Sequence, residues 1–244
     1  MYDALHISCP HSQSELLHFL DSKNISFRES KTRKGLAEYS FYMKNLYITS
    51  RADHLNIKGS ISHYTQGNNI HPLAMNQIKP AIEKLSNDLG TNIHLGRVTS
   101  FEASDSYLVE HNVGHYLDMF KLWRGKEPQY TNDGSRNFGG STQMKFYDKV
   151  KQILAQNHFL PEHYKGTNLL RCELLRKRGL ERRGKGLIKP LLVPEMYSEE
   201  HIIKISKEYL KNYLLVQKVK VKNGVRMKEL DELVKRGVKQ YLNP

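Results

Sequence analysis

The sequence predicts an α+β protein built on a central, largely antiparallel β-sheet flanked by helices, with a small helical appendage at the C-terminal end. Two observations support this fold class. Strand-like runs rich in β-branched and aromatic residues recur along most of the chain, with helical periodicities between them. Two helical patterns then follow one another after the last strand-like run. We therefore expect one domain over residues 1–190 and a helical segment over 195–244.

Helical and strand patterns alternate in the N-terminal half. Ser14 is an expected N-cap, and an apolar residue every three or four positions indicates an amphipathic helix that ends at Gly90. A polar turn closes the second strand-like run at Gly67. The expected elements are a helix over 14–21, a strand over 36–50, a strand over 55–69 and a helix over 75–89.

The C-terminal half continues with strands and ends in helices. A glycine-rich polar stretch predicts a loop in the middle of the chain, and Ser198 is the expected N-cap of the first C-terminal helix. The expected elements are a strand over 93–109, a loop over 129–142, a strand over 141–149, a helix over 149–159, a strand over 167–178, and helices over 198–215 and 226–242.

The net charge points to a polyanionic partner. The chain has 244 residues with 38 basic and 25 acidic side chains, which leaves a formal charge of +13. Such a surplus attracts nucleic acid, because each phosphate contact releases counterions. Residues 176–189 hold seven basic residues and one acid with interspersed glycines, so this stretch is expected to be a flexible loop. Two interpretations stay open for it: a solvated basic run, or a segment that grips a phosphate backbone beside an active site.

Composition and motifs exclude several classes of protein. Two distant cysteines exclude a disulfide scaffold and a cysteine-rich zinc module. The sequence contains no P-loop, no dinucleotide-binding glycine motif, no H-E-x-x-H and no His-hydrophobic-His pair. It also has neither a long apolar run nor a secretory signal pattern, so we expect a protein of the cytoplasm, without a membrane partner.

A tyrosine between two lysines is a candidate nucleophile. In the run STQMKFYDK, strand alternation places Lys145, Tyr147 and Lys149 on one face and Met144 and Phe146 on the other. A free phenol has a pKa of about 10, and nearby ammonium groups or a metal ion favour its reactive phenolate. By itself, such a pattern more commonly marks a half-exposed strand with its tyrosine and lysines in solvent.

Two glutamates stand among apolar neighbours in strand-like runs. Glu102 lies in TSFEAS and Glu173 in LLRCELLRKR. Because a buried, unpaired carboxylate is costly, each is expected to be paired or bound to a metal such as Mg²⁺ or Mn²⁺. The alternative for Glu173 is a salt bridge with Arg171, two residues earlier on the same strand face.

Five segments in order resemble the rolling-circle replication initiators of filamentous phages (the gene II/X type) and, more distantly, those of staphylococcal plasmids. MYDALHISCP resembles the first strand of this family, and LNIKGSISHYTQGNN resembles its strand with a Gly-x-Asn turn. VTSFEAS, KFYDKVKQI and LLRCELLRK resemble its acidic, tyrosine and R-x-E-x-R segments. Together these segments cover about residues 1–185.

The resemblance implies roles for individual residues. Tyr147 matches the nucleophile, Lys149 its neighbouring cation, and Glu102 and Glu173 the acidic pair that holds Mg²⁺ or Mn²⁺. Arg171 matches the arginine that precedes the second acid.

The sequence departs from the family pattern at three positions. Ser100 replaces an arginine, Glu102 replaces an aspartate, and Gln152 replaces an acid five residues after the tyrosine. If that acid is a ligand in the family, the metal site here either has fewer ligands or is completed by another residue, with Asp105 and Asp148 as candidates.

The implied activity is DNA nicking and joining. The tyrosine would attack a phosphodiester of single-stranded or origin DNA in a bacterial host cell, giving a 5′-phosphotyrosyl link and a free 3′-OH. A host helicase and DNA polymerase are the implied later partners. The residues expected to contact DNA are Lys145, Arg171, Arg176, Lys177, Arg178, Arg182, Arg183 and Lys185.

Two other functions remain open from the sequence. One is a DNA-binding regulator without catalysis, in which the C-terminal helices form a helix-turn-helix and the carboxylates are structural. The other is a metal-dependent nuclease that uses water as the nucleophile.

Overall fold

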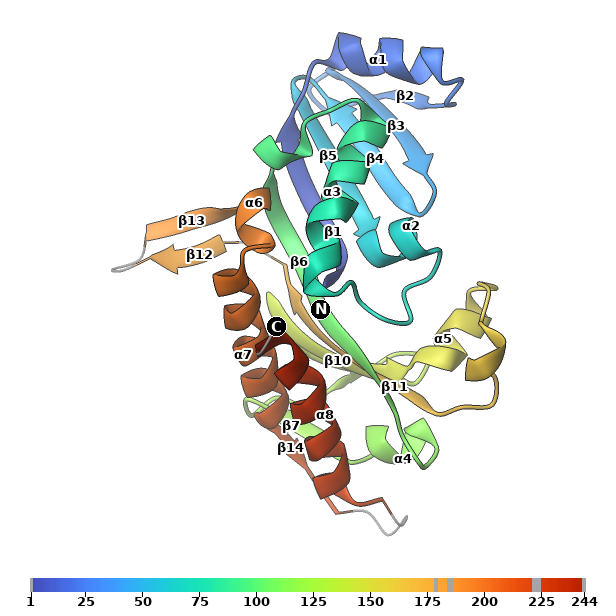
Figure 1. Cartoon of the computed structure of the whole chain (residues 1–244), viewed down its shortest axis with the longest axis vertical. Coiled ribbons are helices and arrows are strands. Elements are labelled where there is room, and N and C mark those ends of the chain that lie inside the picture. The colour runs from blue at the N-terminus through green and yellow to red at the C-terminus, as the bar shows by residue number, and fades with distance from the viewer. Residues whose placement is uncertain (1, 178–179, 184–186, 221–224, 243–244) are drawn as a thin grey trace.

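The computed structural model describes residues 2–177, 180–183, 187–220 and 225–242, with the backbone alone for 180–183, 187–189 and 227. One large sheet, in which every described strand pairing is antiparallel, forms the centre of the molecule (Figure 1). With helices packed against it, this architecture confirms the predicted α+β class.

The strands of the large sheet follow the order β2-β3-β4-β5-β1-β6-β11-β10-β9-β8. The antiparallel pair β12–β13 joins it through β6, and β7 pairs with β14 outside it. The strands are β1 (Tyr2–Pro10), β2 (Arg28–Lys31), β3 (Ala37–Met43), β4 (Leu46–Arg51), β5 (His54–Ser60), β6 (Arg97–Leu108), β7 (Phe120–Trp123), β8 (Gln129–Tyr130), β9 (Arg136–Gly139), β10 (Thr142–Asp148), β11 (Leu169–Arg176), β12 (Leu180–Arg183), β13 (Leu187–Leu192) and β14 (Val216–Lys218).

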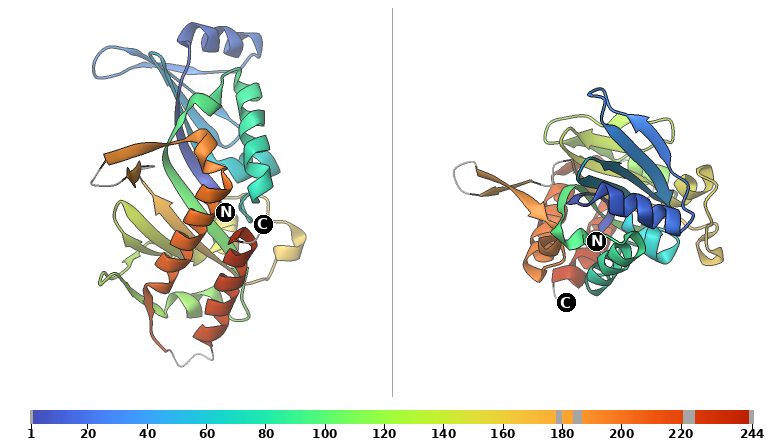
Figure 2. Two further views of the ribbon diagram at one scale, coloured as in Figure 1. Left: turned by 60° about the vertical axis from the view of Figure 1, so that its left-hand side comes forward. Right: turned by 90° about the horizontal axis from the view of Figure 1, so that it is seen from above.

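The three longest of the described helices pack against one face of this sheet, as two views of the ribbon show (Figure 2), whereas the short helix over Lys149–Ala155 packs on the other face beside Leu169. The Tyr209 hydroxyl of α7 donates to the Cys172 carbonyl of β11, and Gly237 of α8 lies against Tyr107 of β6. The helices are α1 (Gln13–Ser22), α2 (Ile61–Gln66), α3 (Met75–Leu89), α4 (Val113–Leu117), α5 (Lys149–Ala155), α6 (Val193–Met196), α7 (Glu199–Leu214) and α8 (Met227–Leu242), with short 3-10 turns at Ile93–Leu95 and Glu162–Tyr164.

The hydrophobic core lies between these helices and the sheet. Buried residues of α3, α7 and α8 belong to the same apolar cluster as those of the central strands. On β1, β5, β4 and β3, the row Ile7, Ile57, Ile48 and Phe41 faces this core. The other face of these strands carries mainly polar side chains and is not occupied by this core, so a site can form there.

Several helix predictions are confirmed. The helix α3 ends at Gly90, which adopts a left-handed φ of 59°. Ser198 caps α7 by accepting a hydrogen bond from the backbone N–H of His201, and α8 begins and ends within the predicted range. These helices have strong amphipathic periodicity and clear end signals, which is why the sequence alone predicts them.

Other element predictions are wrong in detail. The range 36–50 is two strands, β3 and β4, joined by a tight turn in which Lys44 has a positive φ. Residues 55–69 form a strand only to Ser60, whose hydroxyl caps the short helix α2. Ser12 rather than Ser14 caps α1. In each case a tight turn or a capping hydroxyl, rather than the apolar pattern, sets where the element begins or ends.

Two stretches expected to be loops contain strands. The polar stretch over 129–142 includes β8 and β9, which extend the sheet beyond β10. The basic run includes β12 and β13, which pair with each other and project from the body of the molecule (Figure 1). These strands form hairpins with their neighbours along the chain, β8 with β9, β9 with β10 and β12 with β13, and a polar or basic composition does not report such pairing.

Candidate metal centre and tyrosine site

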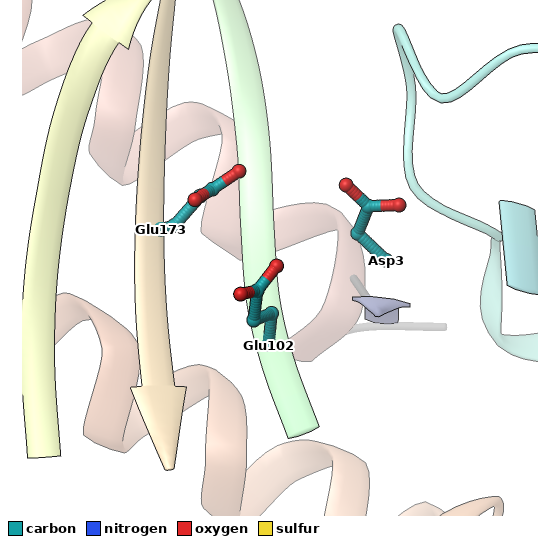
Figure 3. Close-up of side chains that lie close together, drawn as sticks. All are labelled: Asp3, Glu102 and Glu173. Carbon is teal, nitrogen blue, oxygen red and sulfur yellow. The ribbon is translucent and has the colours of Figure 1, made fainter. Parts of the chain in front are cut away.

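Three carboxylates converge on the sheet face opposite α7 and α8. Asp3 of β1, Glu102 of β6 and Glu173 of β11 each offer an oxygen within 4.8 Å of the others. Figure 3 shows the three side chains pointing toward one another across β6, with helices behind the strands. The structure therefore brings together the two acids singled out in the sequence and adds a third.

Strand alternation explains why Glu102 and Glu173 share this face. Glu173 pairs with Ser104, and Glu102 lies two residues before Ser104 on the same strand. Their neighbours Cys172 and Ala103 point to the other face and are fully buried in the core. Two acids far apart in the chain thus meet because β6 and β11 are adjacent and in this register.

Asp3 joins the site through a β-bulge. Tyr2 pairs with Ala103 and Leu5 with Phe101, so β1 spans three residue steps where β6 spans two. The extra residue lets both Tyr2 and Leu5 face the core while Asp3 projects to the opposite side. Asp3 is not among the residues predicted for the site, although it is an acid inside the strand-like run MYDALHISCP, the same signal that identified Glu102.

Arg171 organises the cluster from within the protein. Its side chain is fully buried, and its guanidinium donates to Asp3 at 2.6 Å and lies 3.4 Å from Glu173. It also donates to the hydroxyls of Ser104 and Ser106 and to the carbonyl of Ile70. This is the salt bridge expected as the alternative for Glu173. The expectation that Arg171 contacts DNA is wrong, because its donors are all turned inward.

Asp3 receives further hydrogen bonds. The hydroxyl of Ser60 donates to its Oδ1, and the amide of Asn69 donates to its Oδ2 at 3.2 Å. These contacts tie the end of β5 and the following loop to the cluster.

Tyr147 lies against the cluster. Its hydroxyl donates a hydrogen bond of 2.5 Å to Glu173, and only 3% of the residue is exposed. Burial raises the pKa of this phenol well above its usual value, and the negative charge of Glu173 adds to the increase. In the absence of a metal ion, burial and the charge of Glu173 thus outweigh the effect of the neighbouring ammonium groups on this phenol.

Two lysines flank the tyrosine ring. The Nζ atom of Lys145 lies 4.5 Å from the ring centroid, and that of Lys149 lies 5.9 Å from it. Lys149 is the first residue of α5 rather than a strand residue, and it donates to Asn69 and Gln152 at 2.9 Å each. Burial, followed by the charge of Arg171, lowers the pKa of Lys149 to about 8.

The environment of Glu102 favours a bound cation. Burial, followed by the charges of Glu173 and Asp3, raises the pKa of the Glu102 carboxyl to about 8. No side chain or backbone group in the described part of the chain donates a hydrogen bond to this carboxylate, and the residue is partly exposed. A set of three carboxylates with one accessible member fits Mg²⁺ or Mn²⁺, which prefer oxygen ligands.

The two further candidates for metal binding lie elsewhere. Asp105 is on the helix-covered face of β6, where it pairs in register with Cys172 and lies against Gly237 of α8. Asp148 is the N-cap of α5 and accepts a hydrogen bond from the backbone N–H of Lys151. Alternation and helix capping thus remove both from the cluster, and Asp3 takes the place expected for them.

The predicted DNA-contacting residues are placed unevenly. Lys145 lies on the open face beside Glu173, and Lys177 is exposed at the end of β11. Arg176 points to the helix side, where it pairs with Glu208 of α7 at 3.2 Å. Arg178 and Lys185, and the side chains of Arg182 and Arg183, lie outside the described residues.

Within the described residues, no other group of three potential ligands converges as these acids do, and no helix has the length and apolarity needed to cross a membrane. No protein-family model matches the chain, and no curated protein matches it. The resemblance to rolling-circle initiators therefore stays a prediction.

Proposed function

We propose that this protein nicks and rejoins DNA, with Tyr147 as the nucleophile and the carboxylates of Asp3, Glu102 and Glu173 as the ligands of Mg²⁺ or Mn²⁺. The observation that carries the proposal is the 2.5 Å hydrogen bond from Tyr147 to Glu173 inside the three-acid cluster. It supports a site in which one carboxylate, that of Glu173, both accepts a hydrogen bond from the nucleophile and helps to bind the cation.

The chain's own residues supply most of the chemistry. Tyr147 Oη forms a bond to phosphorus while the bond from phosphorus to the 3′ oxygen breaks. Glu173 Oε1 accepts the phenolic proton along the existing hydrogen bond, and the departing 3′ oxygen takes up one proton, so protons balance. Lys145 places a positive charge beside the Tyr147 ring. This charge would stabilise the negative charge that builds up on the phosphate during the attack.

A bound divalent cation would supply Lewis acidity toward the phosphate oxygens. Arg171 acts as a positioning residue, because it holds Asp3 and Glu173 in place without reaching the surface. One phosphodiester replaces another, so the reaction is close to isoenergetic and the same site can rejoin strands. The free 3′-OH is a substrate for a polymerase, which agrees with the polymerase and helicase that the resemblance implies as partners.

The test is a search for a covalent adduct. Purified protein is incubated with Mn²⁺ and a random-sequence single-stranded DNA library, and complexes that survive denaturing detergent are digested and analysed by mass spectrometry. We expect a phosphotyrosyl linkage at Tyr147 that disappears with chelator and in Tyr147→Phe. The matched control Tyr130→Phe, at an exposed tyrosine of β8, retains it.

Two results would replace the proposal by one of its alternatives. Cleavage without an adduct, retained in Tyr147→Phe, identifies a nuclease that uses water. Binding of duplex DNA without cleavage and without metal dependence identifies a regulator.

A further inference from the structure

The sheet face that carries the three carboxylates continues over strands β1 to β5, where Tyr42 and Lys58 are exposed. On this face the side chains of one row are Tyr42, Tyr47, Lys58, His6 and Ser100, each directly opposite the next in the pairing register. Ser100 lies two residues before Glu102 on the same face of β6. The row therefore leads from the β3–β4 hairpin to the acidic cluster.

The far end of this row is aromatic and exposed. Tyr42 is 69% exposed and Tyr47 is 38% exposed, and their ring centroids are 5.1 Å apart. Large aromatic surfaces are costly to leave in water, and two on a polar sheet face form a patch suited to flat, apolar ligand surfaces. The opposite face of the same strands has its apolar residues packed in the core, so these two rings are not part of that core.

The surroundings of the pair are basic and otherwise polar. Lys58 follows Tyr47 in the row and is exposed, and Arg28 and Arg51 are exposed on the same face. Among the described residues on this face of β2 to β5, Glu38 is the one acidic side chain. The field over the patch thus attracts an anionic ligand.

We propose that Tyr42 and Tyr47 form a stacking platform for the bases of single-stranded DNA that extends from the acidic cluster. This inference rests on the proposed function for the identity of the ligand. Bases stack on aromatic rings while a basic groove follows the phosphates, and single strands expose the base faces that a duplex hides. Strands are about 4.8 Å apart, so Tyr47 lies roughly 14 Å and Tyr42 roughly 19 Å from β6 across the sheet. A strand held at the cluster reaches the rings within a few nucleotides.

The experiment measures binding without cleavage. A fluorescein-labelled oligothymidine of about 15 nucleotides, long enough to span the row, is titrated with the full chain in the presence of chelator, and fluorescence anisotropy gives the dissociation constant. We expect Tyr42→Ala and Tyr47→Ala each to weaken binding about fivefold or more, while Tyr42→Phe and Tyr47→Phe stay near the wild type because they keep the ring. Tyr130→Ala is the matched control, because it removes an exposed tyrosine on β8, at the other end of the sheet.

A second measurement identifies the contact itself. An oligonucleotide with 5-iodouracil is irradiated in the complex, and the crosslinked peptide is sequenced by mass spectrometry. We expect the crosslink on the peptide that contains Tyr42 or Tyr47. Thermal unfolding of each variant checks that the fold is intact. Because substitutions at exposed positions usually change stability little, a loss of DNA affinity can be assigned to the missing ring.

The outcomes separate this inference from the proposed function. Unchanged affinity in both alanine variants overturns the platform, even if Tyr147 forms its adduct. Loss of affinity together with a crosslink supports the platform, even if no adduct forms at Tyr147. A protein that forms dimers through these tyrosines, shown by dissociation of the dimer in the alanine variants with DNA affinity unchanged, also overturns it.

Discussion

The hydroxyl of Tyr147 donates to Oε1 of Glu173 at 2.5 Å, and the same oxygen lies 3.4 Å from Nε of Arg171. One carboxylate thus contacts the candidate nucleophile and the buried cation, and lies within the three-acid cluster. Any change in the charge of this cluster therefore changes the electrostatic environment of the Tyr147 hydroxyl.

Asp3 is expected to be a metal ligand. Asp3→Asn keeps an acceptor for Ser60 but removes a charged oxygen, so we expect Mn²⁺ affinity to fall at least about tenfold, and adduct formation with it. Isothermal titration calorimetry with Mn²⁺ measures the affinity. Asp105→Asn, on the other face of β6, is the control that leaves Mn²⁺ affinity unchanged. Equal effects of the two substitutions would remove Asp3 from the metal site.

The charge on Glu102 is expected to destabilise the metal-free protein above neutral pH. The pKa of this carboxyl is about 8 in the folded chain, against an ordinary value of 4.5, so the folded state binds more protons between these values and stability falls as pH rises through that window. Glu102→Gln removes the charge without changing the shape. We expect its melting temperature at pH 9 in chelator to exceed that of the wild type by several degrees, and the gap to close below pH 4.5. A constant gap at every pH would show that this carboxyl does not carry the pH dependence.

Arg171 is expected to act on stability rather than directly on DNA. Lysine cannot reproduce its contacts with Asp3, Glu173 and the neighbouring hydroxyls, so Arg171→Lys leaves buried acids incompletely paired, at a cost of about 3 kcal/mol. Urea denaturation measures this cost. Lys145→Gln, on the accessible side of the cluster, is expected to leave the unfolding free energy nearly unchanged and to lower DNA affinity. A fully stable Arg171→Lys protein with weakened DNA binding would contradict the assignment.

Gly139 is expected to be required for the β9–β10 hairpin, whose second strand carries Tyr147. Its φ is 97°, and an added Cβ would lie 2.4 Å from the carbonyl oxygen of Thr142 and 2.5 Å from the Trp123 ring. Neither the backbone at Thr142 nor the buried indole of Trp123 can move freely. Gly139→Ala should therefore lower the unfolding free energy by more than 2 kcal/mol, which is about twice the cost of the backbone strain alone. Gly134→Ala provides the control, since Gly134 also has a positive φ but has open space around it. Similar melting temperatures for the two variants would show that close packing at Gly139 is unimportant.

Local signals were sufficient for part of this structure. The helices α3, α7 and α8 follow from amphipathic spacing and capping residues such as Ser198 and Gly90, which act within a few positions of one another. Alternation likewise placed Lys145 and Tyr147 on one face of their strand, whereas the meeting of Tyr147 with Glu173 required the pairing of β10 with β11. Short strands such as β8 and β12 pair with the next strand along the chain, but their polar or basic composition lacks the apolar alternation that would predict a strand.

The sequence by itself determined the fold class, the basic charge and the presence of acids within apolar strands. Tertiary structure alone decided that Asp3 completes the cluster and that Arg171 is buried among the acids. The physical reason is the bulge in β1 and the adjacency of β1, β6 and β11: a single extra residue reverses which face a side chain takes, and only pairing between distant strands sets where that residue lies.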